Sequence, residues 1–285
     1  MKTIAITGAG GFLGGVLTQY FSDNGYLVRR LVRDPEGGAE SYRFDLTNGF
    51  DENALLGVDV LIHAAHDFTP RKGGEMKRIN VEGSRKLFES AKKAGVAKII
   101  FISSVSAFPG CASLYGNAKL EIEELARQCG GKSVRPGLIY GREGKGMFGS
   151  LEKIVTKLPL IPVFDGGGQK MVLAQVDDLA HAIGKVIEEY ETLSTESITL
   201  ANPEEVPFRE LLSQIATKVG KRPHFVTVPS SFALFGLRTL EAIHVRLPFR
   251  SDSLVSLLNA NPKLNISSNM SSSMRPFVAG AQTFK

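Results

Sequence analysis

Short apolar segments alternate with segments of helical periodicity through the first half of the chain. The apolar segments predict strands at Thr3–Thr7, Leu27–Val32, Tyr42–Phe44, Val60–Ala64, Lys98–Ser103 and Ser133–Arg135. Between them, apolar residues three and four apart predict helices from Gly11, from about Met76 to Ala94 and from about Leu114 to Gln128. Such alternation indicates βαβ units. We therefore expect an α/β fold, a Rossmann-type doubly wound parallel sheet.

The pattern is weaker after Tyr140. Glycine-rich turns stand near 144–149 and 165–168, and two helical patterns begin near Asp177, a candidate helix cap, and Pro207. This half predicts a smaller α+β lobe at the C-terminal side. We expect the larger domain over residues 1–141, joined by 170–200, and the lobe over 142–169 and 201–266. Residues 267–285 are Ser-rich and predict a flexible tail.

Composition is that of a globular protein and excludes several classes. The chain has 285 residues, of which 43% are hydrophobic and 22% charged, and its net charge of +5 is spread without a basic run. We therefore expect no nucleic-acid partner. Two cysteines, Cys111 and Cys129, form neither a disulfide framework nor a metal site. Without a signal peptide or membrane-spanning segment, we expect a cytoplasmic protein with no membrane association.

Glycine is in excess, at 30 of 285 residues, and the positions of the first glycines suggest a ligand-binding turn. Gly8, Gly11 and Gly14 follow the first predicted strand and open a helix. Glycine permits a tight turn there and close approach of the backbone to a pyrophosphate. The N-terminus of the helix then offers unpaired N–H groups to the anion. This setting predicts a dinucleotide site, so the larger domain is expected to bind NAD(P) and the lobe to bind substrate.

The glycine spacing resembles the Thr-Gly-x-x-Gly-x-x-Gly form of the short-chain dehydrogenase/reductase superfamily. Further motifs over residues 3–141 resemble its extended branch, the NAD-dependent epimerase/dehydratase family: Asp45-Leu46, His63-Ala64-Ala65-His66, Asn80-Val81-Glu82-Gly83, Ser103-Ser104, Tyr115-x-x-x-Lys119 and Arg135–Gly141. The resemblance implies cofactor contacts at Gly8, Gly11, Phe12, Leu13, Gly14, Asp45, Leu46, His63, Ala64, Ala65, Tyr115, Lys119, Pro136, Gly137 and Leu138. Within that set, Pro136–Leu138 would contact the carboxamide.

The residues at the end of the second predicted strand determine whether NAD or NADP is preferred. An acid near its end selects NAD, whereas an arginine accommodates the 2′-phosphate of NADP. Here Val32 stands at the usual acid position and Arg33 follows, so we favour NADP over NAD, with Arg33 as the phosphate ligand. If the strand extends further, Asp34 faces the ribose and NAD is preferred. Asp45, by resemblance, contacts the adenine amino group, and its alternative is a turn carboxylate before Thr47-Asn48-Gly49.

Ser104, Tyr115 and Lys119 are the predicted catalytic residues. Tyr115 and Lys119 stand four apart, so they share one face of a helix. A phenolate near pH 7 needs the tyrosine pKa to fall by about 3 units, and a neighbouring ammonium and an oxidised nicotinamide both act in that direction. The resemblance adds a hydrogen bond from Lys119 to the nicotinamide ribose. Ser104 would hold the substrate oxygen while Tyr115 moves the proton.

Several other residues have structural interpretations. His63 and His66 are expected to be wall residues rather than acid/base catalysts, and Asn80 is expected to fix the backbone near the fourth strand. Cys111 is expected to be a structural thiol. Phenylalanines at 225, 232, 235 and 249 are expected in the core. For Arg142 and Lys145, a solvated loop position is favoured over contact with substrate phosphates.

The sequence also departs from the resembled family. Nucleotide-sugar 4,6-dehydratases carry an Asp-Glu pair after the catalytic hydroxyl, and Val105-Ser106 cannot supply the extra acid and base. The leading hypothesis is therefore an NAD(P)-dependent epimerase or oxidoreductase that acts at a secondary alcohol or ketone, with a nucleotide sugar as the small-molecule substrate. A one-way NADPH-dependent reductase of a keto-sugar or non-sugar ketone is the alternative, favoured by the NADP preference. A non-catalytic NADP(H)-binding sensor or assembly subunit is a second alternative, and a homodimer is expected by resemblance only.

Overall fold

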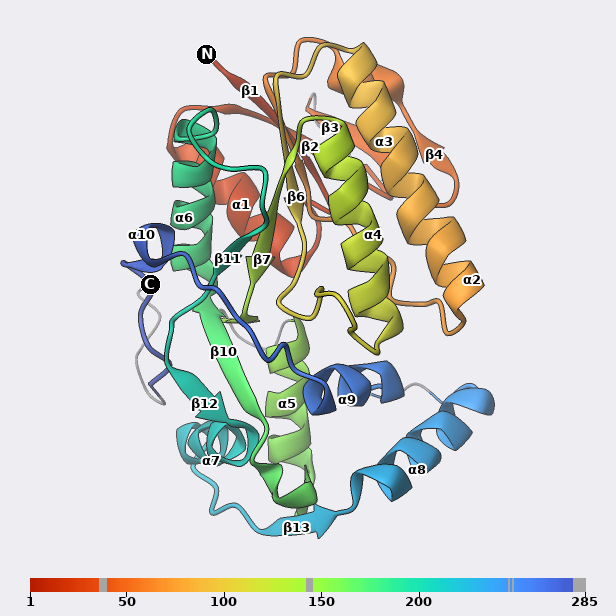
Figure 1. Ribbon diagram of the computed structural model, residues 1–285, viewed down its shortest axis with the longest axis vertical. Coiled ribbons are helices and arrows are strands. Elements are labelled where there is room, and N and C mark those ends of the chain that lie inside the picture. Colours follow the sequence, from red (N-terminus) through yellow and green to blue (C-terminus); the bar gives the residue numbers. More distant parts are fainter. Residues whose placement is uncertain (36–39, 142–145, 246, 248, 279–285) are drawn as a thin grey trace.

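The structure, a computed structural model, describes residues 1–35, 40–141, 146–245, 247 and 249–278. Its centre is an eight-stranded sheet in the order β11-β7-β6-β5-β1-β2-β3-β4 (Figure 1). The strands of this sheet are β1 (Thr3–Thr7), β2 (Leu27–Val32), β3 (Ser41–Asp45), β4 (Gly49–Phe50), β5 (Val60–His63), β6 (Lys98–Ile102), β7 (Lys132–Pro136) and β11 (Ile198–Leu200). All neighbours pair in parallel except β3 and β4. The predicted doubly wound α/β fold is confirmed.

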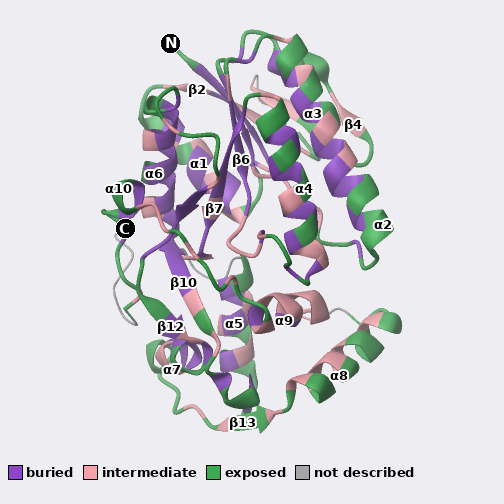
Figure 2. Cartoon of the chain, in the orientation of Figure 1, coloured by how far each residue is buried: buried purple, intermediate pink, exposed green. Residues whose placement is uncertain are grey.

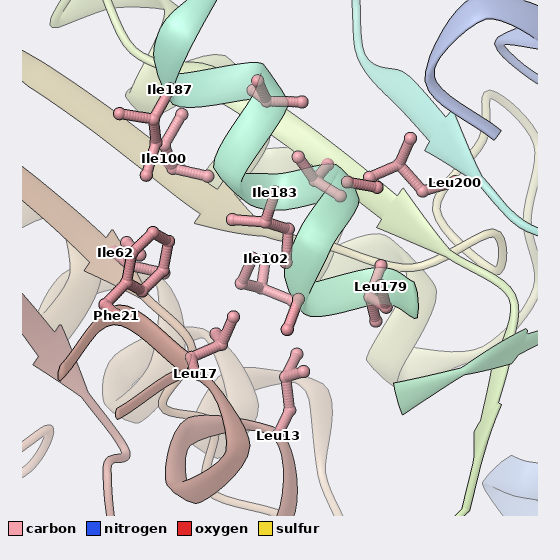
Figure 3. Close-up of a cluster of buried hydrophobic side chains, with 14 of the residues drawn as sticks. Leu13, Leu17, Phe21, Ile62, Ile100, Ile102, Leu179, Ile183, Ile187 and Leu200 are labelled. Atoms are coloured by element: carbon pink, nitrogen blue, oxygen red, sulfur yellow. The ribbon is translucent and has the colours of Figure 1, made fainter. Parts of the chain in front are cut away.

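Helices cover both faces of this sheet. On one face lie α1 (Phe12–Asp23) and α6 (Val176–Glu188), and on the other lie α3 (Glu82–Lys93) and α4 (Leu114–Gln128). A short helix, α2 (Gly73–Met76), and a π-helical turn, Lys77–Val81, lead into α3. Each face has its own core, because strands buried on both sides are apolar on both sides. Figure 3 shows α1 and α6 meeting over the strands through Leu17, Ile183 and Ile62.

A smaller lobe packs beneath the sheet (Figure 1). Its segments lie before and after α6 and β11 in the chain. It contains a three-stranded sheet and a parallel strand pair, with a separate core around Phe164, Leu211 and Leu254. Its elements are α5 (Gly146–Lys157), β8 (Leu138–Tyr140), β9 (Ile161–Phe164), β10 (Lys170–Gln175), β12 (Glu205–Pro207), α7 (Phe208–Lys218), β13 (Phe225–Val228), α8 (Ser230–Ala242) and α9 (Ser251–Leu258). A 3-10 turn stands at Glu52–Leu55 and another at Asp165–Gly167. Most strands here have only three or four residues, too few to show a clear period of two.

The structure differs from the expected flexible tail over 267–285. Residues 268–271 form a short helix, α10 (Ser268–Ser271), and Met270 and Met274 are buried against the α1–α6 core. The side chain of Asn202 donates to the carbonyl of Met274 at 2.8 Å, and Arg275 pairs with Asp178 at 2.8 Å. Two methionines four apart within a serine-rich segment bury enough surface to anchor it. Residues 279–285 lie outside the described part of the chain.

Two smaller expectations are wrong. The cap of α6 is Gln175 and not Asp177, because the Gln175 side-chain oxygen accepts from the backbone N–H groups of residues 177 and 178, at 2.6 and 2.9 Å. Phe232 and Phe235 are not core residues: they are 72% and 73% exposed. Both lie on α8, which has no buried residue and projects from the edge of the lobe (Figure 2). Phe225 and Phe249 do pack against the core of the lobe.

Candidate active site

A cavity of about 1110 Å³ lies between the sheet and the lobe, at the carboxyl ends of β1, β2, β5 and β6. Parallel α/β sheets bind ligands at this edge, because the loops there diverge. One side of the cavity is formed by the glycine turn after β1 and the ends of the neighbouring strands. The other side is formed by the lobe, including Met171, Phe249 and Leu257. The cavity therefore joins the predicted cofactor site to the predicted substrate lobe.

The glycine turn has the close backbone approach expected of a dinucleotide cradle. Gly8 adopts a φ of +68°, and the N–H of Gly11 donates to the Gly8 carbonyl at 2.8 Å. A Cβ on Gly14 would lie 2.1 Å from the Gly8 oxygen, so α1 begins too close to the turn for any side chain there. No side chain caps the N-terminus of α1, which leaves its first N–H groups to an anion. The residues present thus fit a pyrophosphate.

The residues expected to select the cofactor lie along the same wall. Arg33 and Asp34 are both exposed and both line the cavity beyond β2, as do Phe12, Leu13, Leu46, Ala64 and Ala65. Asp45 also lines it. One oxygen of Asp45 accepts from the backbone N–H groups of Thr47 and Asn48, at 2.7 and 2.8 Å. Asp45 therefore acts as the turn carboxylate after β3. Both of these bonds use Oδ1, so neither involves Oδ2.

His63 does not line the cavity, contrary to the expectation of a cofactor contact. It is fully buried behind the wall, hydrogen-bonded to the Thr7 hydroxyl at 2.7 Å and to the Ser84 hydroxyl at 2.8 Å. Burial lowers the pKa of His63 to about 3, so the ring is neutral. A neutral imidazole with one partner on each nitrogen ties β1 and β5 to α3. Its role in this structure is to hold the elements that shape the site.

Ser104, Tyr115 and Lys119 lie together at the cavity. The Ser104 side chain lies close enough to Tyr115 to lower the pKa of the phenol in part. Lys119 is 3% exposed, and its Nζ donates to the Ile102 carbonyl at 2.7 Å and lies 5.7 Å from the centre of the Tyr115 ring. Serine and tyrosine are therefore placed to share one ligand oxygen, with a cation behind the phenol.

The protein's own groups do not by themselves lower the tyrosine pKa. Burial raises the pKa of Tyr115 to about 12, and the nearby Ser104 side chain offsets only part of that shift. Burial likewise lowers the pKa of Lys119 to about 7, against the opposing charge of Glu123. Desolvation is the larger effect on both groups: Lys119 is buried against the sheet, and Tyr115 is half-buried beside the rings of His66 and Phe68. The protein's own groups therefore hold Tyr115 as a neutral phenol, ready to donate a proton.

A buried network that the sequence did not indicate supports α4 from behind. The Glu123 carboxylate accepts two hydrogen bonds from Arg135, at 2.6 and 2.7 Å, and one each from Ser103 and Ser197. Bidentate pairing of this kind fixes geometry as well as charge. It joins the helix that carries Tyr115 and Lys119 to the ends of β6 and β7. No single motif contains these residues, so only the fold could reveal them.

The N-terminus of α4 is held by the lobe. The carboxylate of Asp252, from α9, accepts from the backbone N–H groups of Leu114 and Tyr115, at 2.7 and 3.0 Å. Ser113 adds its own cap, accepting from the Gly116 N–H at 3.0 Å. An acid at a helix N-terminus satisfies free donors and complements the helix dipole. Asp252 lies 137 residues from Tyr115 in the chain, and nothing in the local sequence predicts the contact.

An aromatic cluster covers Tyr115 on the cavity side. The His66 ring meets the Tyr115 ring edge-on at 5.0 Å, and Phe68 stacks on Tyr115 at 5.7 Å. Both His66 nitrogens are buried, and neither has a hydrogen-bond partner among the described residues. The side chain of Asn80 holds this loop, as expected, by accepting from the Asp67 N–H at 2.7 Å and donating to the Asp67 carbonyl. His66 is thus a wall residue with unused hydrogen-bonding capacity, signalled by the second histidine of His63-Ala64-Ala65-His66.

Pro136, Gly137 and Leu138 line the cavity where β7 leads into the lobe. A Cβ on Gly137 would lie 2.5 Å from the Val172 carbonyl oxygen, so β10 approaches this turn closely. The two described cations that the lobe contributes to the cavity already have partners: Lys170 pairs with Glu205 at 2.8 Å, and Arg250 donates to the carbonyls of Phe68 and Pro70. Arg142 and Lys145 lie outside the described residues.

The described residues contain neither a cluster of metal-binding side chains nor a membrane-spanning helix. Over that part of the chain, no group of three or more His, Cys, Asp or Glu side chains is placed to hold a metal ion. Among the helices in the same ranges, none combines the length and apolar character that crossing a bilayer requires.

Known proteins resemble this chain in both sequence and structure. A "Ceramide reductase" of Caulobacter vibrioides is 28% identical over 241 residues, covering 79% of this chain and 73% of that protein. The "Uncharacterized protein Rv2047c" of Mycobacterium tuberculosis is 26% identical over 250 residues, which cover 85% of this chain but only 26% of that protein. The second relative is thus a much longer protein, of which this chain matches about a quarter.

Solved structures share the fold. "MoeE5 in complex with UDP-glucose and NAD" superposes with a TM-score of 0.69 at 22% identity, covering 80% of this chain and 85% of that one. The "UDP-Glucuronic acid 4-epimerase from Bacillus cereus in complex with NAD" gives 0.68 at 21% identity, over 80% and 87% of the two chains. The sequence profile of the "NAD dependent epimerase/dehydratase family" matches residues 4–201, more than half of the chain. With the glycine turn and the parallel sheet already in place, this match shows that the chain belongs to the NAD-dependent epimerase/dehydratase family.

Proposed function

We propose that this protein is an NAD(P)-dependent oxidoreductase that transfers a hydride at a secondary alcohol or ketone. The observation that carries the proposal is the meeting of Ser104, Tyr115 and Lys119 at a cavity that also contains the glycine turn. These residues are chemically suited to hold an oxygen and to move its proton. The retention of both Tyr115 and Lys119 weighs against a non-catalytic sensor or assembly subunit.

The same three residues suffice for a one-way reduction. Ser104 hydrogen-bonds the substrate carbonyl oxygen, and Tyr115 donates its phenolic proton to that oxygen as negative charge develops on it. A nicotinamide cofactor, when bound, supplies the hydride. Protonated Lys119 supplies positive charge behind the phenol and stabilises the tyrosinate that forms, and because burial lowers the pKa of Lys119 to about 7, this charge is lost as pH rises through neutrality. Tyr115 is a neutral phenol at neutral pH, so its proton is available, and positive charge beside it is needed to offset the desolvation that raises its pKa to about 12.

We propose NADP as the cofactor, with Arg33 as the ligand of its 2′-phosphate. Arg33 is exposed and lines the cavity beyond Val32, which leaves the guanidinium free to approach a phosphate. Asp34, the residue that would favour NAD, lies next to it. Consumption of reducing equivalents in one direction is consistent with an NADPH-dependent reductase. The solved relatives named above carry NAD in their titles, so cofactor preference is a feature in which this chain would differ from them.

Two substrate classes follow from different observations. A nucleotide sugar is the substrate expected from the family, and UDP-glucose is bound in the MoeE5 structure. A ketone with an apolar body is favoured by the lobe wall, where Met171, Phe249 and Leu257 face the cavity, and by the likeness to a ceramide reductase. The second class fits a one-way reductase.

A hydride-transfer screen tests the proposal. Purified protein is offered ketones, keto-sugars and nucleotide sugars with NADPH or NADH, and cofactor oxidation is followed. Tyr115→Phe should reduce turnover by about a hundredfold or more while cofactor binding is retained. Unchanged turnover in that variant would exclude the mechanism, and cofactor that co-purifies with the protein and interconverts sugar nucleotides would point to an epimerase.

A further inference from the structure

Helix α8 presents an apolar face to solvent. Phe232, Phe235 and Ile243 are 72%, 73% and 66% exposed. Phe232, Phe235 and Thr239 follow one another at steps of three and four on α8, and Ile243 continues this side one residue beyond the helix, so a threonine interrupts the apolar residues there. Large apolar residues scattered singly need no explanation, but a row of them on one helix face indicates an interaction surface.

The opposite side of α8 is also apolar. Ala233, Leu234 and Leu237 pack against the core of the lobe, which attaches the helix to the protein. A helix that is apolar on both sides normally has both sides covered. The inward side of α8 is covered by the lobe, and the outward side is covered by nothing in the described structure.

The apolar surface continues onto the neighbouring strands. β13 leads through Pro229 into α8, and it pairs in parallel with β9. Val226 on β13 and Leu160, directly before β9, are both exposed. In Figure 1 β13 and α8 form the lower edge of the molecule, away from the main sheet. We call this edge the α8 surface: Leu160, Val226, Phe232, Phe235 and Ile243.

Cations outnumber acids around the α8 surface, although the carboxylate of exposed Asp165 accepts the Ser230 N–H at the start of α8. The segment from 219 to 245 contains three cations, Lys221, Arg222 and Arg238, and all three residues are exposed. Its single acid, Glu241, is turned inward, where its carboxylate accepts from the N–H and hydroxyl of Ser251 at 2.8 and 2.7 Å. An exposed apolar face bordered by cations complements an anionic lipid surface. A second copy of the same face would bring like charges together.

We propose that the α8 surface binds the surface of an anionic lipid bilayer. The helix would lie in the plane of the interface, with Phe232, Phe235 and Ile243 inserted at the boundary between headgroups and acyl chains. Arg222 and Arg238 would contact anionic headgroups, whereas Lys221 already donates to the carbonyls of Val155 and Thr156. No segment crosses the bilayer in this arrangement. The binding is a property of the lobe's outer edge and does not rest on the proposed hydride transfer.

The test is sedimentation of the full chain with lipid vesicles. Vesicles of phosphatidylcholine with an equal share of phosphatidylglycerol should bind the protein, and binding should weaken with added salt and on vesicles of phosphatidylcholine alone. The double variant Phe232→Ser/Phe235→Ser should lose at least about tenfold in affinity for the anionic vesicles. Leu56→Ser is the matched control, because Leu56 is also exposed but lies on the sheet domain, and it should bind like the unchanged protein.

Each outcome decides the proposal. Because both phenylalanines are exposed, the double variant should keep its circular dichroism and melting temperature, and Arg222→Glu/Arg238→Glu provides a second variant that leaves the apolar face intact. Loss of anionic-vesicle binding in both variants supports the proposal. Equal sedimentation of all variants, or none with the unchanged protein, would overturn it. So would light scattering that shows a dimer broken by Phe232→Ser/Phe235→Ser without vesicle binding, because the occupant would then be a second copy.

Discussion

The carboxylate of Asp252 holds the backbone of Tyr115, accepting its N–H at 3.0 Å and that of Leu114 at 2.7 Å. The lobe is therefore joined to the first turn of the helix that carries the proposed proton donor. Asp252→Ala removes this cap, and we expect a loss of about 1 kcal/mol in the free energy of unfolding. We also expect kcat to fall about tenfold or more, because small displacements of a reacting group are costly.

Asp252→Asn is the matched control, since its amide oxygen can still accept one of the two bonds. It should recover a large part of both losses. Steady-state kinetics and chemical denaturation measure the two effects, and binding of NADPH by titration should be nearly unchanged in either variant. If Asp252→Ala lost stability but kept its kcat, the carboxylate would be a structural cap without a positioning role.

His66 carries buried nitrogens without partners, and this has opposite consequences for stability and activity. A buried polar atom that makes no hydrogen bond is costly, so His66→Phe, which is close in shape, should leave stability unchanged or raise it by about 1 kcal/mol. A substrate with a hydroxyl or amide near its reacting carbon would satisfy the ring in the complex. With such a substrate, the kcat/KM of the His66→Phe variant should be about tenfold lower than that of the unchanged protein.

Thermal unfolding and kinetics of His66→Phe, with Phe68→Leu as a control that keeps the imidazole, test this prediction. A fall in stability together with unchanged kcat/KM would show that His66 has only a packing role.

Much of the sheet domain could be predicted because its signals are local. β1, β2, β5 and β6 are apolar runs bounded by turns, and the glycines after β1 act within one turn of chain. Tyr115 and Lys119 share a helix face, so their proximity follows from spacing alone. These features need no knowledge of distant contacts.

The remaining features depend on contacts between segments far apart in sequence. Asp252 and Glu123 act through residues on other elements, and no local pattern marks either residue. The expected fall in the pKa of Tyr115 relied on Lys119 and an oxidised nicotinamide, whereas within the protein alone desolvation has the larger effect and raises that pKa. Phe232 and Phe235 looked like core residues because apolar character does not reveal which helix face is covered.

Arg33 should determine the preference for NADPH over NADH. We expect the unchanged protein to bind NADPH more tightly, and Arg33→Ala to reduce that preference about tenfold by removing a charge-assisted bond to the 2′-phosphate. Arg43→Ala is the control, since Arg43 is an exposed arginine on β3 that does not line the cavity. Fluorescence titration with both cofactors measures the ratio. Tighter binding of NADH by the unchanged protein would assign the selectivity to Asp34 instead.

Burial of neutral His63 makes stability depend on pH in the acid range. The pKa of His63 is about 3 in the folded protein, against about 6.5 in an unfolded chain. Below pH 6.5 the unfolded state therefore binds more protons than the folded state, and stability must decrease as pH falls from about 6.5 towards 3. The loss approaches about 1.4 kcal/mol per pH unit from this one group.

His63→Gln isolates that contribution. The variant loses well-formed bonds to Thr7 and Ser84, so at neutral pH it should be less stable by roughly 1 to 3 kcal/mol. The glutamine does not titrate, so the difference between the two proteins should shrink steadily between about pH 6.5 and pH 4.5. Urea denaturation at several pH values measures it, and groups common to both proteins, including His66, largely cancel in the difference. A difference that stays constant over this range would mean that His63 is not held neutral by the fold.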